Sequence, residues 1–146
     1  MSLIIAASVV SLLLQGGGAS TQARPIKIVS AAPSTSESAA SARQWLALVD
    51  GLHWGESWSA AGAEFRSHIS AEQWGAKVQP VRRPLGAVSS RVLQSVTKAT
   101  SLPGAPDGQY EILQFTTSFA QKPEATETVT LAHEPSGWKV DGYFIK

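Results

Sequence analysis

The 146-residue sequence predicts an α+β domain, in which N-terminal helices pack in the concave face of a curved, mainly antiparallel four-stranded sheet. Apolar residues recur at three- and four-residue steps in the first half, which is the helical period. After residue 88, β-branched and aromatic residues alternate with polar ones, which is the strand period. Short intervals between these strand segments favour an antiparallel meander, and the length suits one domain.

The N-terminus has a composition of its own. Residues 3–14 form an uncharged apolar run of the length of a signal-peptide core, too short to span a bilayer. Small residues follow it, so we expect a signal peptide over residues 1–23, cleaved after Ala19 or Ala23, although no Lys or Arg precedes the run. A buried N-terminal helix is the alternative, but no amphipathic stripe supports one.

Export to the periplasm or the extracellular space is therefore expected, with no stable membrane span after cleavage. Residues 24–37, rich in Ser, Ala and Pro, are expected to form a flexible leader before a single domain at 38–146. The sequence contains no cysteine, which excludes disulfides and a lipid-modified thiol. Its formal net charge of +1 gives no field that would attract nucleic acid or an anionic membrane.

Three helices are expected. The first carries the stripe Ala42, Trp45, Leu46, Val49 and Leu52 and ends at Gly51. The second carries the stripe Trp54, Trp58, Ala61, Phe65 and Ile69 on one continuous helix, which Gly62 weakens locally.

The third helix is predicted to start at Ala71, because Ser70 and Gln73 form a capping-box pattern before it. It should bury Trp74 and Val78. Pro80 should end or kink it near Gln79, because proline lacks a backbone N–H and clashes with the preceding turn. Residues 82–86 then form a turn out of the helical half.

Four strands are expected, at residues 88–100, 109–120, 125–134 and 138–146. In the second strand one face is formed by Leu113, Phe115 and Phe119. In the last strand, strict alternation places Trp138, Val140 and Phe144 on a face opposite Lys139, Asp141, Tyr143 and Ile145.

The sequence resembles a bacterial family of unknown function, the DUF4019 domain, over residues 42–145. The pattern is carried by Trp45-Leu46-Ala47-Leu48-Val49-Asp50, Ser57-Trp58, Phe65, Trp74, Arg83-Pro84-Leu85-Gly86, residues 102–108, Glu127-Thr128-Val129 and Gly142-Tyr143. The resemblance implies an exported, cone-shaped domain of the NTF2-like kind. It supplies no assigned activity, so no catalytic residue is carried over. Pro80 departs from the pattern and puts the geometry of the following turn in doubt.

Catalytic and metal-binding patterns are weak. His53, His68 and His133 are scattered without metal-ligand spacing, and no nucleophile elbow or phosphate-binding glycine motif occurs, so neither a metal nor a cofactor is expected. The candidates for acid–base chemistry are Asp50, Asp107, Glu111, Glu127 and Asp141. Each has an ordinary structural interpretation: Asp50 near a helix end, Asp107 in a turn, and the other three on the solvated face of strands. Asp50 is kept as a weak catalytic candidate.

Arg82 and Arg83 are the more informative feature, because a planar guanidinium at the junction of two structural halves could clamp a carboxylate of a ligand or a partner protein. The favoured alternative is a salt bridge to the domain's own acid, Asp50 or Asp107. Trp54 at a helix start, Asp107 in the 102–108 loop, and Tyr143 complete the candidates for ligand or partner binding. That loop would form either a rim for recognition or a well-ordered turn.

Three functional hypotheses follow. The leading one is a non-enzymatic envelope module that binds a small molecule or an envelope protein. The second is an NTF2-like isomerase or hydrolase with a pocket carboxylate, such as Asp50, as general base. The third is a structural domain that forms a homodimer through an open sheet face with apolar residues such as Leu113 and Val129.

Overall fold

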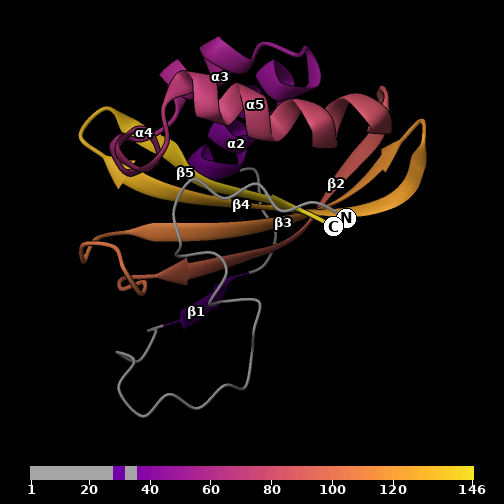
Figure 1. Cartoon of the computed structure of the whole chain (residues 1–146). Helices are drawn as coiled ribbons and strands as arrows, with labels where there is room; N and C mark the ends of the chain where they lie inside the picture. Colours follow the sequence, from indigo (N-terminus) through magenta and orange to yellow (C-terminus); the bar gives the residue numbers. More distant parts are fainter. Residues whose placement is uncertain (1–27, 32–35) are drawn as a thin grey trace.

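The computed structural model describes residues 28–31 and 36–146, so the expected signal peptide and most of the expected leader lie outside the described residues. In this part of the chain, helices precede all but one of the strands (Figure 1). The helices are α2 (Glu37–Asp50), α3 (Trp54–Ala60), α4 (Ala63–His68), α5 (Ala71–Arg82) and the 3-10 helix η1 (Arg83–Leu85). The strands are β1 (Ile28–Ala31), β2 (Val88–Ala99), β3 (Tyr110–Phe119), β4 (Lys122–Glu134) and β5 (Gly137–Ile145).

Strands β2 to β5 form the predicted antiparallel meander, with neighbours in chain order, and this confirms the α+β class. A fifth strand, β1, was not predicted: it lies within the segment expected to be a flexible leader and pairs with β2, Ile28 opposite Ala99. Without β1, the edge of β2 would offer unpaired backbone N–H and C=O groups, and pairing with β1 satisfies them.

The helices cover one face of the sheet, and the ends of β3 and β4 that share a turn bend up toward the C-terminal end of α5 (Figure 1). Two backbone hydrogen bonds hold this bend, Ala120 N–H to Ala87 O at 2.8 Å and Gln121 N–H to Leu85 O at 2.9 Å. The helices therefore lie on the concave face, as predicted. No described helix is long and apolar enough to cross a membrane.

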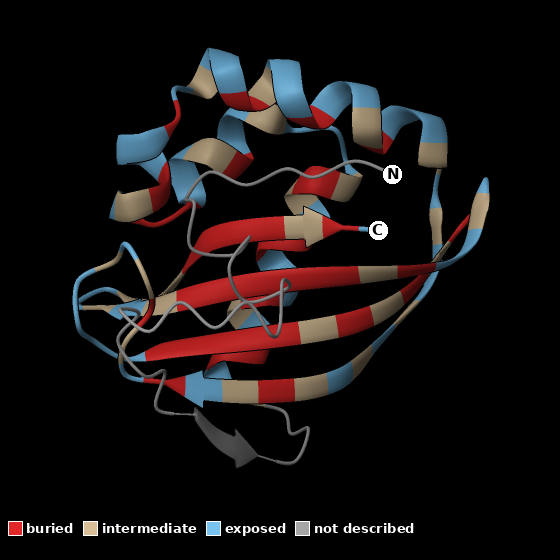
Figure 2. Ribbon diagram, turned by 60° about the horizontal axis from the view of Figure 1, so that its bottom comes forward, coloured by how far each residue is buried: buried red, intermediate tan, exposed pale blue. Residues whose placement is uncertain are grey.

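Aromatic rings fill the space between the helices and the sheet. The Trp45 ring lies 5.4 Å from the Tyr143 ring and 5.8 Å from Trp74, and Phe65 lies 5.0 Å from Trp74. Figure 2 shows that buried residues also run along the central strands. Leu113 and Val129 are fully buried members of this core, so the apolar open face of the dimer hypothesis is wrong for these residues.

The predicted second helix is in fact two helices, α3 and α4, separated at Ala61 and Gly62. Gly62 has an extended backbone and donates its N–H to Val140 O at 2.7 Å. A Cβ atom at Gly62 would collide with Asp141 Oδ1 and come within 2.7 Å of Glu134 Oε2. Close docking on β5 therefore interrupts the helix, while Trp58, Phe65 and Ile69 still reach the same core.

The third helix starts as predicted, with a capping box between Ser70 and Gln73, but it does not end near Gln79. It continues through Pro80 to Arg82 and then tightens into η1. Pro80 and Ala76 are exposed, so the carbonyl that loses its helical partner can be hydrated. Leu52 also departs from prediction: it follows the end of α2 with φ 64° and is 43% exposed, outside the apolar stripe.

The face assignment in the last strand is wrong beyond Val140. The β4–β5 register shifts between Thr130 and Leu131, so that Leu131 pairs with Val140 and Thr130 with Gly142. This irregularity changes the alternation, and Tyr143 and Ile145 join Val140 in the core while Phe144 does not. In β3 no such shift separates Leu113 from Phe115, and both lie in the core with Phe119 as predicted.

Candidate functional site

A network of four charged side chains lies where the helices meet the sheet, and we call it the Asp50 network: Asp50, Arg82, Arg91 and Glu127. Asp50 is the last residue of α2, and its Oδ1 accepts a hydrogen bond from Nη2 of Arg82, the last residue of α5, at 2.9 Å. Arg91 of β2 binds the same carboxylate with both terminal nitrogens, at 2.7 and 3.0 Å. One carboxylate thereby joins two helix ends to the sheet.

The network continues across the strands through Glu127. Arg91 Nε donates to Glu127 Oε1 at 2.8 Å, and Thr117 Oγ1 donates to the same oxygen at 2.5 Å. The Tyr143 hydroxyl donates to the other oxygen, Oε2. Because Arg91 and Thr117 are register partners in β2 and β3, the donors converge from three strands on one carboxylate.

The two acids and two arginines balance in charge. Burial alone raises the pKa of Asp50, but the hydrogen bonds and charges of Arg91 and Arg82 outweigh it and hold that pKa below the usual value. Burial lowers the pKa of Arg91, but Asp50 and Glu127 raise it above the usual value overall. Burial and the neighbouring Glu127 raise the pKa of the Tyr143 hydroxyl well above its usual value.

Arg82 makes two further contacts in addition to its ion pair, while its Nε has no hydrogen-bond partner among the described residues. Its Nη1 donates to Gly86 O at 2.7 Å, and its guanidinium carbon lies 4.4 Å from the centre of the Phe119 ring. Gly86 has φ 77°, and a Cβ atom there would come to 3.1 Å from Ala120 Cβ. Glycine is required at this turn for both reasons, and the turn is what presents the carbonyl to Arg82.

The structure thus brings together three of the predicted site residues, Asp50, Arg82 and Tyr143. The favoured alternative for Arg82, a salt bridge to the domain's own Asp50, is correct. Asp50 is a poor general base in this arrangement, because both of its oxygens accept bonds from guanidinium groups and its pKa is lowered.

The other three predicted site residues lie apart. Arg83 is exposed and forms no ion pair with any described residue, and Trp54 is half-buried against the core. Asp107 is exposed in the 102–108 loop, at the opposite end of β3 from Phe119 and Arg82. That loop is anchored by buried Leu102 and by the Tyr110 hydroxyl, which donates to Pro106 O.

The sequence analysis was wrong to place Glu111, Glu127 and Asp141 on a solvated face, because they are 7%, 0% and 6% exposed. It also missed Arg91. A signal was present for Glu127, which shares its strand face with the apolar Val129 and Leu131. The buried carboxylate of Glu111 has its own partner, because Ser38 in the first turn of α2 donates a hydrogen bond to it.

Asp141 forms a second buried acidic feature, beneath the start of α4. Its pKa is raised to about 7, chiefly by burial and also by the nearby carboxylates of Glu134 and Glu64, while a backbone hydrogen bond from Phe65 and the charge of His68 act to lower it. Glu134 accepts the Ala63 N–H at 2.8 Å, so two strand carboxyl groups receive N–H groups of the first turn of α4. This geometry explains the close approach of Gly62.

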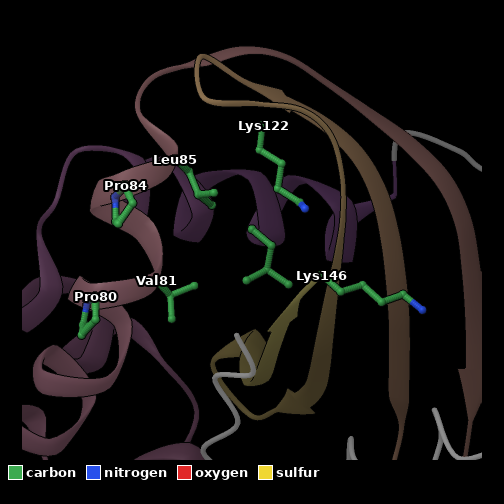
Figure 3. Close-up of a pocket in the computed structure, with 7 residues that line it drawn as sticks. Pro80, Val81, Pro84, Leu85, Lys122 and Lys146 are labelled. Carbon is green, nitrogen blue, oxygen red and sulfur yellow. The ribbon is translucent and has the colours of Figure 1, made fainter. Parts of the chain in front are cut away.

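Two surface pockets lie at the seams between the helices and the sheet. The first, which we call the α5–β5 pocket, has a volume of about 240 Å³ (Figure 3) and is lined by Pro80, Val81, Pro84, Leu85, Lys122, Ile145 and Lys146. The second, the α2–hairpin pocket, measures about 440 Å³ and lies between α2, the end of α3 and the β4–β5 hairpin, with Gln44, Leu48 and Trp138 in its walls. No Asp, Glu or His side chain lines either pocket, and no three His, Asp or Glu residues in the described ranges converge as metal ligands.

A family model described as a protein of unknown function, DUF4019, matches residues 41–143. The chain belongs to this family. Comparison with curated proteins and with solved structures gave no match. Membership of the NTF2-like superfamily therefore stays a prediction.

The adjacent arginines provide a matched test of the Asp50 network. Arg82→Met keeps much of the side-chain volume but removes the charge, and we expect it to lower the free energy of unfolding by about 3 kcal/mol. This is the lower end for breaking a buried pair, because Asp50 retains Arg91. Arg83→Met should change it by less than about 0.5 kcal/mol, because the side chain is exposed. Urea unfolding measures both; equal effects would contradict the assignment.

Asp141 predicts a pH dependence of stability. Its folded-state pKa of about 7 lies above the usual value of 3.8. Between these two values the folded protein keeps a proton on Asp141 that the unfolded chain releases, so the free energy of unfolding falls as pH rises toward 7. We expect Asp141→Asn to match the wild type near pH 4 and to exceed it at pH 8 by on the order of 2–4 kcal/mol. Chemical unfolding at both pH values is the measurement, with exposed Glu124→Gln as the control. A variant less stable than wild type at pH 8 would refute the interpretation.

Proposed function

We propose that this protein is an exported, non-enzymatic binding module that holds a small molecule in the α5–β5 pocket. The observation that carries the proposal is the contrast between the interior and this seam. In the Asp50 network the interior charges form ion pairs with one another. The pocket, in contrast, is an open and largely apolar concavity that no described side chain fills. Ligand sites of proteins are typically apolar concavities with a few polar groups.

The walls of the pocket are preformed. Pro80 and Pro84 have fixed backbone φ angles, and the bonds from Ala120 and Gln121 fix the turn between β3 and β4 beside Leu85. Ile145 is held by the sheet and is only 3% exposed. A rigid pocket loses little conformational entropy when a ligand binds.

The geometry favours binding over catalysis. Asp50, the weak candidate for a general base, is held in ion pairs, and Asp141, whose pKa suits acid–base chemistry, lines neither pocket. The volume of about 240 Å³ lies below the range of about 300–1,000 Å³ for pockets of drug-sized ligands, so the proposed ligand is a smaller molecule.

The test is thermal unfolding of the purified protein against a library of small metabolites. A ligand of the folded state raises the midpoint by mass action. Leu85→Trp should fill the α5–β5 pocket and abolish the shift, whereas Leu48→Trp, the same change in the α2–hairpin pocket, should preserve it. If no compound shifts the wild type, or if only Leu48→Trp abolishes the shift, the proposed site is wrong.

Export is tested separately. The proposal rests here on the uncharged apolar run at residues 3–14 and the small residues after it. When the full chain is expressed in a bacterium, we expect the envelope fraction to contain a protein whose N-terminus is Ser20 or Arg24. Mass spectrometry of the fractionated protein measures this, and an intact chain confined to the cytoplasm would contradict it.

A further inference from the structure

The α5–β5 pocket combines apolar walls with two lysine side chains. Lys122 and Lys146 line it, and none of its seven lining residues is acidic. Neither lysine forms an ion pair with a described residue, in contrast to Arg82 and Arg91 in the interior. A ligand that supplied a negative charge at this position would complete the pocket.

Lys122 is the lysine that faces the pocket. The β3–β4 register shifts between Thr117 and Phe119, so that Lys122 pairs with Phe119, a residue of the core beneath the helices. This irregularity turns the start of β4 toward the helix layer, and Lys122 is only half-exposed. In Figure 3 its amine extends into the space beside Leu85, whereas Lys146 extends away from it.

We propose that the ligand of this pocket is a short amphiphilic monoanion, a carboxylate on a small apolar body; this inference rests on the function proposed above. The carboxylate binds the Lys122 ammonium, and the apolar body lies against Val81, Leu85 and Ile145.

Both parts of the ligand are needed. An ion pair at a partly exposed site contributes little free energy, so the charge gives selectivity and the apolar contact gives most of the affinity. The small volume limits the body to a short chain or a single ring. A polyphosphate or a nucleotide fits poorly, because the pocket offers no arginine fork and no helix N-terminus.

The experiment titrates the purified protein with three probes and follows amide chemical shifts by NMR. Hexanoate carries both parts of the predicted ligand, 1-hexanol carries only the apolar part, and acetate carries only the charge. We expect hexanoate to bind roughly fivefold more tightly than 1-hexanol and at least roughly tenfold more tightly than acetate, with shifts at residues 80–85 and 145.

Variants assign the charge. Lys122→Gln should weaken hexanoate binding roughly fivefold and leave hexanol unchanged, and Lys122→Arg should restore most of the hexanoate affinity. Lys98→Gln is the matched control, since Lys98 is exposed and pairs with Glu111 at the opposite end of β3. Circular dichroism of each variant verifies that it is folded.

The outcomes separate the two proposals. Equal affinity for hexanol and hexanoate, or no effect of Lys122→Gln, overturns the anionic ligand while the pocket itself stands. Equal affinity for acetate and hexanoate overturns the apolar requirement. If no probe binds to the wild type, the inferred ligand class is wrong, and the library screen with Leu85→Trp then decides whether the pocket binds any small molecule.

Discussion

The carboxylate of Asp50 is the point at which the helical layer is fixed to the sheet. It receives hydrogen bonds from Arg82 at the end of α5 and from Arg91 in β2, and Arg91 extends the connection to Glu127 in β4. Two helix ends and two strands therefore depend on one set of matched charges. Burying these groups costs free energy that their ion pairs and hydrogen bonds must offset, which ties the position of each element to that of the others.

This constraint also determines where the pocket forms. Arg82 reaches Asp50 and Gly86 O at once, which holds η1 and the following turn against the end of α5. The turn between β3 and β4 then bonds to Leu85 and Ala87. Proline, leucine and isoleucine side chains from these segments meet around a concavity instead of closing it. The charged network thus supports the proposed binding site without lining it.

Three departures from regular structure direct the remaining side chains. The register shift in β4 and β5 turns Tyr143 and Ile145 toward the core, where Tyr143 meets Glu127 and Ile145 lines the pocket. The shift between β3 and β4 turns Lys122 toward the helices. The close approach of Gly62 to Asp141 and Glu134 ends one helix and starts the next. Each irregularity interrupts the regular backbone pattern and thereby places a particular side chain.

Local rules in the sequence determined the class of fold, the end of α2 at Gly51, the N-cap of α5, and the apolar faces of α2 and β3, because period and capping depend only on neighbouring residues. The family was also readable from the sequence. Only the tertiary structure decided that Arg82 binds Asp50 and Arg83 does not, that Glu127 is buried beside Arg91, and that Lys122 faces a pocket. These results depend on strand register and on contacts between residues 10 to 41 positions apart, which no local pattern specifies.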